Sequence, residues 1–416
     1  MFTQRIRERR LTTTEPLMPS PPATEPAAGR RTRPAAAMTV ACVALFTDML
    51  VYGIAIPVLP LLPATVQAGP AATGVLFAGY AAAMIAVTPI AGRMVDRAGP
   101  RRPLLVGLVG LAAATLLFAV GGPYWLLVVA RILQGVAAGM SWVAGLSLIA
   151  AVTPFATRGR SMGLAMSMVS LGLLIGPPLA GLLAENLGTA APFLFAAAVA
   201  LTDGIARLVL VRDGGRVTDD PVGPLAVLRV RGSWSVVGVV VLGAASLSAI
   251  EPVLPLHLTQ RYGTGALGLG LLFAVAIVAV AVLSPLVGGL IGRVDARVLV
   301  GVGVATSASA LAILAVSQQS WQVWVGMTAL GASNAFLLAP ATTLISAQGM
   351  TSSPPALGGA YALFNLAYAA GLMLGPLLAG TGTDLAGFAV ALCASAAVVA
   401  VLGAAVTARL PSGLLR

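Results

Sequence analysis

The stretch Gly172-Leu-Leu-Ile-Gly-Pro-Pro-Leu-Ala-Gly181 recurs almost unchanged as Gly371-Leu-Met-Leu-Gly-Pro-Leu-Leu-Ala-Gly380. Two more pairs of segments match in the same order, Pro57–Leu61 with Pro252–Leu256 and Gly92–Arg97 with Gly292–Arg297. One match could arise from composition alone, but three matches at nearly constant spacing indicate an internal duplication. The chain is therefore predicted to contain two parallel halves of similar structure.

The composition places both halves in a lipid bilayer. Apolar residues make up 58% of the chain, charged residues only 9%, and the mean hydropathy is +0.98, which is far outside the range of soluble domains. A helix needs about 20 apolar residues to cross the hydrocarbon core. Twelve such segments are predicted, at residues 37–62, 72–92, 103–121, 124–153, 161–184, 190–211, 234–259, 266–291, 297–317, 321–349, 356–380 and 385–408.

These segments are continuous apolar runs rich in Gly and Ala, unlike the alternating strands of about 10 residues in a membrane barrel. The predicted fold is an all-α membrane protein of twelve transmembrane helices in two pseudo-symmetric six-helix bundles. Two halves related in this way can rock against each other around a site at the midplane. The predicted limits are a disordered cytoplasmic tail (1–36), the first bundle (37–211), a charged cytoplasmic linker (212–233), the second bundle (234–410) and a short tail (411–416).

All 24 basic residues are arginines, and all except Arg131 and Arg261 are assigned to one side of the predicted helices. Because positively charged loops stay in the cytoplasm, both termini are predicted to be cytoplasmic. The net charge of +11 then reflects topology. A nucleic-acid partner is disfavoured because the arginines are scattered among short loops.

The predicted membrane region contains few of the side chains that enzymes use for catalysis or metal binding. It contains a single His257, two cysteines far apart in sequence, Cys42 and Cys393, and no cluster with the spacing of a metal site. His257 is interpreted as an interfacial residue and the cysteines as free thiols. We therefore expect no enzymatic activity, no metal and no cofactor, with a proton gradient as the driving force.

Three charged residues fall well inside apolar segments. Asp48 lies about eleven residues into the first helix, roughly 16 Å from its start, and Arg131 and Glu251 are similarly embedded. A buried carboxyl group disfavours its charged form, which suits a site that alternates between a proton and an organic cation. A buried guanidinium needs a partner, so Arg131 is predicted to hold or tune a carboxylate, although a purely structural ion pair is the alternative.

Three motifs resemble those of the major facilitator superfamily. The first is Gly92, Arg93, Asp96, Arg97 and Arg101, a tight turn predicted to latch a cytoplasmic gate, with an ordinary positively charged loop as the alternative. The second surrounds Arg131. The third gives close helix packing and a kink at Gly172, Gly176, Pro177 and Gly181 and at their copies Gly371, Gly375 and Pro376. In the family the third motif marks antiporters, so the direction of transport rests on resemblance.

Further stretches resemble the vesicular amine transporter branch and related drug:proton antiporters. Asp48 precedes Pro57-Val-Leu-Pro60 by nine residues, Glu251 begins Glu-Pro-Val-Leu-Pro255, and Gly188-Thr-Ala-Ala-Pro192 leads to Asp203-Gly204. The resemblance implies that Asp48 holds the substrate amine and that Glu251 pairs with Arg131 or carries the coupling proton. Asp203 and Arg207 are interpreted instead as an i,i+4 ion pair.

The chain also departs from that branch. A Lys and an Asp that form an ion pair in the amine transporters are replaced together, by Tyr80 and Asn365, and Asn334 is nearest to a missing Asp in the tenth helix. Losing both partners avoids a lone buried charge. The large loop after the first helix is absent, which favours a bacterial plasma-membrane exporter with fewer coupling acids.

The leading hypothesis is a monomeric, proton-coupled antiporter that exports a cationic or amphiphilic small molecule, as in multidrug efflux. Aromatic rings that could bind a cation through their faces, or simply pack, are Tyr52, Tyr80, Phe336, Tyr361, Phe364 and Tyr368. One alternative is an exporter of a neutral or acidic metabolite in which Asp48 serves only as a proton site. A non-transporting membrane sensor is disfavoured because no soluble signalling domain is visible.

Overall fold

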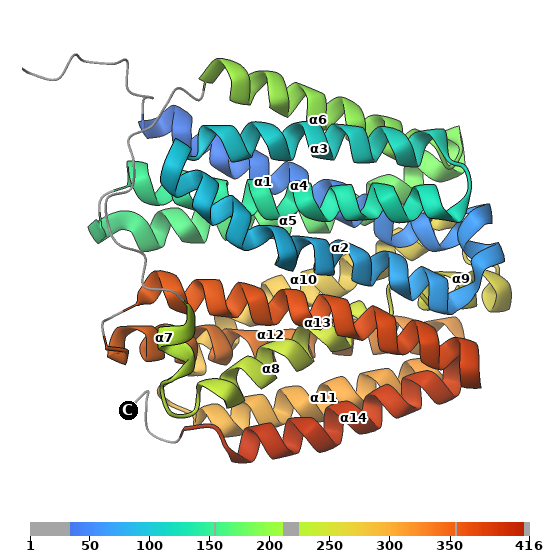
Figure 1. Cartoon of the computed structure of the whole chain (residues 1–416). Helices are drawn as coiled ribbons and strands as arrows, with labels where there is room; N and C mark the ends of the chain where they lie inside the picture. Colours follow the sequence, from blue (N-terminus) through green and yellow to red (C-terminus); the bar gives the residue numbers. More distant parts are fainter. Residues whose placement is uncertain (1–33, 154, 211–223, 354–355, 412–416) are drawn as a thin grey trace, which may run out of the picture. The chain divides into compact units, whose positions relative to one another are not determined.

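The computed structural model describes residues 34–153, 155–210, 224–353 and 356–411, and these residues are almost entirely helical (Figure 1). The first half contains α1 (Pro34–Val58), the short 3-10 helix η1 (Leu59–Leu61), α2 (Pro63–Ala98), α3 (Arg101–Val120), α4 (Tyr124–Val152), α5 (Phe155–Leu187) and α6 (Ala191–Leu210). The second contains α7 (Pro224–Leu228), α8 (Ser233–Ser248), α9 (Leu254–Tyr262), α10 (Ala266–Leu290), α11 (Ala296–Val316), α12 (Ser320–Thr351), α13 (Leu357–Ala386) and α14 (Phe388–Ala408).

The helices confirm the predicted membrane fold. Within the described residues, eleven helices are long and apolar enough to cross a membrane, and α8 is a shorter apolar helix. The predicted seventh span, 234–259, is not continuous. It breaks into α8 and α9 around Glu251 and Pro252, because the proline ring removes a backbone donor and clashes with the preceding turn. Most of the predicted linker and of both tails lies outside the described residues.

The two halves repeat the same helix contacts. α1 packs on α5 as α8 packs on α13, and α2 packs on α4 as α10 packs on α12. The outer helices follow the same rule, since α3 contacts α6 and α11 contacts α14. The sequence duplication is therefore expressed in the packing of each bundle.

The repeated glycine motif brings the first and fifth helices of each half into backbone contact. A Cβ added at Gly172 would lie 2.5 Å from the Phe46 carbonyl oxygen, and one at Gly176 would lie 2.8 Å from that of Leu50. In the second half a Cβ at Gly371 would lie 2.5 Å from the Val241 carbonyl oxygen. Small residues are needed because bilayer helices gain their association energy from such close packing.

The last glycine of each motif contacts the opposite half. A Cβ at Gly181 on α5 would overlap the backbone of α10 at Ala266, and one at Gly380 on α13 would lie 2.6 Å from the Pro70 carbonyl oxygen of α2. The prolines of the motif take part as well, because Cβ atoms at Gly270 and Gly74 would overlap the carbonyl oxygens of Pro177 and Pro376, respectively. These contacts join the halves at the end of the helices remote from the start of α1, which we call the far end.

At the other end, where α1 begins and α14 stops, glycines of the same four helices have open space around them. We call it the near end. A Cβ added at Gly163 on α5 or at Gly289 on α10 would meet no atom of the described residues within 4 Å, and the same holds for Gly92 on α2 and Gly358 on α13. The glycines of these helices therefore make close contacts between the halves at the far end, and those at the near end make none within 4 Å.

The glycine contacts predict a position-dependent cost of adding a methyl group to α5. Gly172→Ala should lower the free energy of unfolding by about 1–3 kcal/mol, because the new Cβ is forced against the backbone of α1. Equilibrium unfolding of the purified protein in detergent measures the change. Gly163→Ala is the matched control on the same helix, where open space and the better helix propensity of Ala should give no loss. Equal losses at the two positions would contradict this packing.

Candidate functional site

Asp48 lies on the surface of α1 that faces α4. A Cβ at Gly145 of α4 would be 3.7 Å from Leu45 and 3.9 Å from the Ala41 carbonyl oxygen, which fixes how the two antiparallel helices pair. One turn further along each helix, Asp48 comes opposite Ser141, and one more turn along α1 brings Tyr52 to the same face. Asp48 is only 2% exposed. Its carboxyl group is therefore buried within the first half.

The surroundings of Asp48 are polar, yet its carboxyl group is unpaired. Ser141 is adjacent, and both Asp203 and Arg207 of α6 lie within range of direct charge–charge interaction. Neither carboxyl oxygen of Asp48 has a hydrogen-bond partner among the described residues. A buried carboxyl group without partners is costly when ionised, so this position favours exchange of a proton or a cation.

Arg131 on α4 is enclosed by aromatic rings. Its guanidinium carbon lies 5.1 Å from the ring centre of Tyr52, 4.7 Å from that of Phe77 and 4.9 Å from that of Tyr80. Nη1 donates to Gln134 Oε1 at 2.5 Å, whereas Nε and Nη2 have no partner among the described residues. The ring faces, which attract cations, compensate for part of the missing hydration of this fully buried charge.

Glu251 joins this cluster from the second half of the chain. The break between α8 and α9 places it in a turn, where it is 5% exposed, and its Oε2 accepts a hydrogen bond of 2.8 Å from the Tyr52 hydroxyl. Tyr52 thus contacts Arg131 with its ring and Glu251 with its hydroxyl. The direct Arg131–Glu251 ion pair that the resemblance suggested is not formed among the described residues, because Tyr52 links the two side chains instead.

Of the other residues predicted to bind the substrate, some lie near Tyr52 and Glu251 and some lie elsewhere. Tyr80 packs against Tyr52 with ring centres 4.9 Å apart, and Tyr368 on α13 lies within the electrostatic range of Glu251. The rings of Phe364 and Tyr368 stack with their centres 6.3 Å apart. Asn365, which follows Phe364 in the chain, is half-buried.

The remaining predicted residues lie elsewhere. Tyr361 is 50% exposed near the start of α13. Phe336 packs towards α11 beside Gly303, and the buried Asn334 faces α8 at Gly243, with its Nδ2 donating to the Leu330 carbonyl oxygen at 3.4 Å. The structure therefore does not bring Tyr361, Phe336 or Asn334 to Glu251 through any contact described here.

The predicted gate motif is helical and does not form a tight turn. α2 continues through Arg93, Asp96 and Arg97 to Ala98, and the chain turns at Gly99, whose φ of 75° suits glycine. Asp96 does not cap the next helix, because the N-cap of α3 is Pro100 without a side-chain hydrogen bond. The turn that was expected here occurs in the second copy, where Asp295 caps α11 by accepting from the Arg297 amide at 2.8 Å.

A sequence model described as "Major Facilitator Superfamily" matches residues 41–242 and again residues 236–413. The chain belongs to the major facilitator superfamily. The two matches correspond to the two halves of repeated packing described above. The duplicated helix bundles that hold the glycine contacts and the Arg131 cluster are therefore the two halves of a superfamily member.

Among known proteins, this superfamily member is similar to the chromaffin granule amine transporter of Rattus norvegicus, with 29% identity over 318 residues. That match covers 76% of this chain and 61% of the rat protein, so the matched region is less than two thirds of the relative. The chain also resembles the probable vesicular acetylcholine transporter-B of Danio rerio, with 35% identity over 42% of this chain and 37% of that protein. The predicted resemblance to the vesicular amine transporter branch is confirmed.

Solved structures agree with the fold. A bacterial homologue of the human lysosomal transporter Spinster, in an inward-facing and unoccupied conformation, has a TM-score of 0.69 at 15% identity, with 91% of this chain and 94% of that chain covered. At this identity the likeness shows the fold alone. The relatives and neighbours named here are transporters, in agreement with the prediction that the chain is not an enzyme.

Sequence reasoning missed three residues of the buried network. Phe77 and Gln134 contact Arg131, and Ser141 lies beside Asp48. Arg207 was predicted only as the i,i+4 partner of Asp203 towards the cytoplasmic end of its helix, and the structure buries it completely in α6. The only signal in the sequence was its spacing of four from Asp203; the confirmed ion pair between them is formed inside the bundle.

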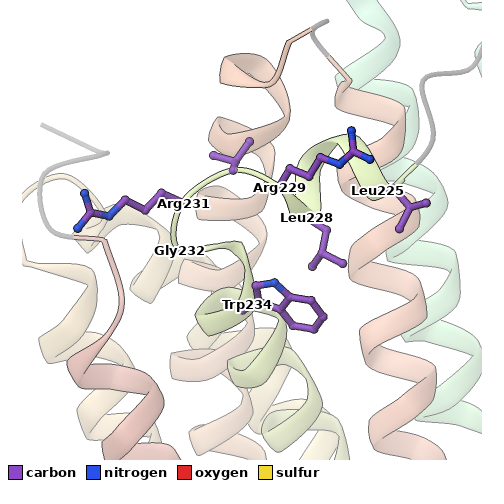
Figure 2. Close-up of a pocket in the computed structure, with 7 residues that line it drawn as sticks. Leu225, Leu228, Arg229, Arg231, Gly232 and Trp234 are labelled. Atoms are coloured by element: carbon purple, nitrogen blue, oxygen red, sulfur yellow. The ribbon is translucent and has the colours of Figure 1, made fainter.

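A surface hollow lies apart from these acids. It has a volume of about 430 Å³ and lies where α7 joins α8, lined by Leu225, Leu228, Arg229, Val230, Arg231, Gly232 and Trp234 (Figure 2). The 16 residues of α8 separate it from Glu251, a distance of about 24 Å along the helix. This hollow is therefore separate from the transport-site candidates.

The hydrogen bond between the halves predicts an unusual cost for a small change. Tyr52→Phe should lower the free energy of unfolding by about 1.5–3 kcal/mol, because it leaves a buried carboxyl oxygen of Glu251 without its donor. Tyr124→Phe is the matched control, since the Tyr124 hydroxyl donates at 2.8 Å to a neutral carbonyl, that of Ala72, within one half.

Equilibrium unfolding in detergent compares the two variants, and combining Tyr52→Phe with Glu251→Gln should cost less than the sum of the single changes. Strict additivity would show that the two side chains do not interact.

Proposed function

We propose that this superfamily member is a proton-coupled antiporter that exports a cationic or amphiphilic small molecule, such as an amine or a drug, by alternating access. The observation that carries the proposal is the pair of buried carboxyl groups. Asp48 has no hydrogen-bond partner, and Glu251 is bonded across the two halves. Acids inside a membrane bundle are energetically costly, so their presence there indicates a substrate or proton pathway.

In the proposed cycle the near end faces the cytoplasm. A cation enters from that side and displaces protons from the acids. The halves then rock, the glycine contacts of the far end separate, and protons from outside release the cation. Because Tyr52 and Glu251 belong to different halves, their hydrogen bond is expected to break during this step. The arginines at the near end support this orientation through the positive-inside rule.

Arg131 has a specific part in this proposal. Its guanidinium occupies the ring faces of Tyr52, Phe77 and Tyr80 that would otherwise suit a substrate cation. The positive charge of Arg131 also repels the substrate cation from these rings while Glu251 is protonated. We infer that ionisation of Glu251 draws Arg131 towards it and frees the rings for the substrate.

The names of the relatives support an amine as the substrate, and the short connection between α1 and α2 supports a bacterial plasma membrane as the location. A second candidate is export of a neutral or acidic metabolite with Asp48 as a proton site only. Because no contact among the described residues joins the buried Asp48 to Tyr361 or Phe336, this alternative is kept in the test.

Inverted membrane vesicles that contain the protein provide the test. On a pH jump that acidifies the lumen, the vesicles should accumulate tetraphenylphosphonium or tyramine, and collapse of the gradient should release them. Asp48→Asn and Glu251→Gln should each lower accumulation at least about tenfold, because a buried charge pair with the cation is lost. Val398→Ala, at an exposed position of α14 that has no part in the candidate site, is the control and should transport normally.

Separate binding and proton-release measurements distinguish the two candidates. If Asp48→Asn loses both cation binding and proton release, Asp48 holds the cation. If it loses only proton release while binding a neutral or acidic compound, the second candidate is correct. Accumulation that is independent of the pH gradient in the unmodified protein would refute proton coupling.

A further inference from the structure

A second buried charge network lies behind Asp48, away from the Arg131 cluster. Arg207 on α6 forms an ion pair with Asp203 through Nη2, one turn earlier on the same helix. Its Nη1 donates to the Leu104 carbonyl oxygen of α3 at 3.3 Å and to Ser141 Oγ of α4 at 3.2 Å. Arg207 is completely buried and Asp203 is 4% exposed. An ordinary surface ion pair would not extend to two neighbouring helices.

Helix packing places this network against Asp48. Ser141, which accepts from Arg207, is the residue that the pairing of α1 with α4 sets opposite Asp48. Thr47, the neighbour of Asp48, is buried beside Asp203 on the α6 side of α1. Ser141 therefore lies between the carboxyl group of Asp48 and the guanidinium of Arg207.

The network has unused hydrogen-bonding capacity on both sides of this gap. Both carboxyl oxygens of Asp48, Oδ1 of Asp203 and Nε of Arg207 have no partner among the described residues. Each buried polar atom that is left without a hydrogen bond is costly, and the network holds such atoms on both acids and on the arginine.

The charges are also unequal in number. One arginine faces two acids, so the group is neutral only when Asp48 carries a proton or binds a cation. When Asp48 is empty and ionised, a net negative charge is buried, and its cost depends on how close the guanidinium lies.

We propose that Arg207 is a positioning residue that divides its charge between Asp203 and Asp48, and so sets how readily Asp48 gives up its proton. When Asp48 is protonated or binds the cation, Arg207 stays with Asp203 and Ser141. When Asp48 is ionised and empty, Arg207 turns towards it and stabilises that state. This inference rests on the proposed role of Asp48 as the exchange site.

Few other titratable groups face Asp48. Tyr52 lies on its own helix, Tyr80 on α2, and Asp203 and Arg207 on α6. On α5, Gly172 packs against the opposite side of α1, and Arg160 and Glu185 lie near the helix ends; α10 contains no charged residue. Arg131 and Glu251, like Asp48, lie within electrostatic range of Tyr80, and neither makes a described contact with Asp48. Changes at α6 should therefore act on Asp48 directly.

An infrared titration of the purified, substrate-free protein tests the inference without knowledge of the substrate. The absorption of a protonated carboxyl group that disappears in Asp48→Asn reports Asp48, and its intensity is followed against pH. Arg207→Gln should move the midpoint of that band to higher pH by about one unit or more, because the nearby positive charge is lost. Asp203→Asn should move the midpoint of the Asp48 band to lower pH, because a nearby negative charge is lost and Arg207 then interacts with Asp48 alone.

The double variant Asp203→Asn with Arg207→Gln removes one charge of each sign and should fold even if Arg207→Gln does not. Its midpoint should lie between those of the unmodified protein and Arg207→Gln. Arg293→Gln, at an exposed arginine of the other half, is the control and should leave the midpoint unchanged.

The opposite signs of the two single changes show that both charges act on Asp48. Movement of Arg207 is read from its guanidinium bands in the same infrared titration, which should change at the Asp48 midpoint in the unmodified protein and stay constant with pH in Asp48→Asn; bands that are constant in both proteins indicate a fixed ion pair. Identical midpoints in Asp203→Asn, in the double variant and in the unmodified protein would overturn the inference about Arg207. That result would leave the proposed transport function standing, because vesicle accumulation tests it independently.

Discussion

The cost of holding a charge where water is absent governs this structure. Among the described residues, five charged side chains are buried inside a bundle whose outer surface is apolar: Asp48, Arg131, Asp203, Arg207 and Glu251. Four of them are compensated: Arg131 by aromatic rings and Gln134, Glu251 by Tyr52, and Arg207 by Asp203, Ser141 and a backbone carbonyl. Asp48 is the one of these five without a hydrogen bond or ion pair, so its state of occupancy affects the balance of the others.

The glycine motif connects this chemistry to movement. Gly172 and Gly176 fix α1, which carries Asp48 and Tyr52, against α5, while Gly181 on the same helix reaches the opposite half. A change of contact at Gly181 and at its copy Gly380 can therefore reorient α1 and α8 without disturbing the packing inside each bundle. Tight packing within halves and glycine contacts between them are the combination that a rocking mechanism needs.

Much of the fold could be predicted from residues, because apolar length and the repeat at Gly172 and Gly371 report directly on packing. The end of α2 could not, since Gly92 and Gly292 look alike in sequence, yet only Gly292 adopts a positive φ. Of the site, Asp48, Glu251 and Arg131 stood out as charges in apolar runs. Their partners did not, because contacts such as Tyr52 with Glu251 and Arg207 with Ser141 join residues far apart in the chain.

In the proposed cycle the two halves change their separation as the occupancy of Asp48 changes. Distances between spin labels measure this directly, with Gly163→Cys on α5 and Gly289→Cys on α10, two near-end positions that have space for a label. Cys42→Ser and Cys393→Ser remove the native thiols. We expect two distances whose populations shift with pH in the otherwise unmodified protein and become independent of pH with Asp48→Asn. A single distance that neither pH nor an added organic cation changes would contradict this cycle.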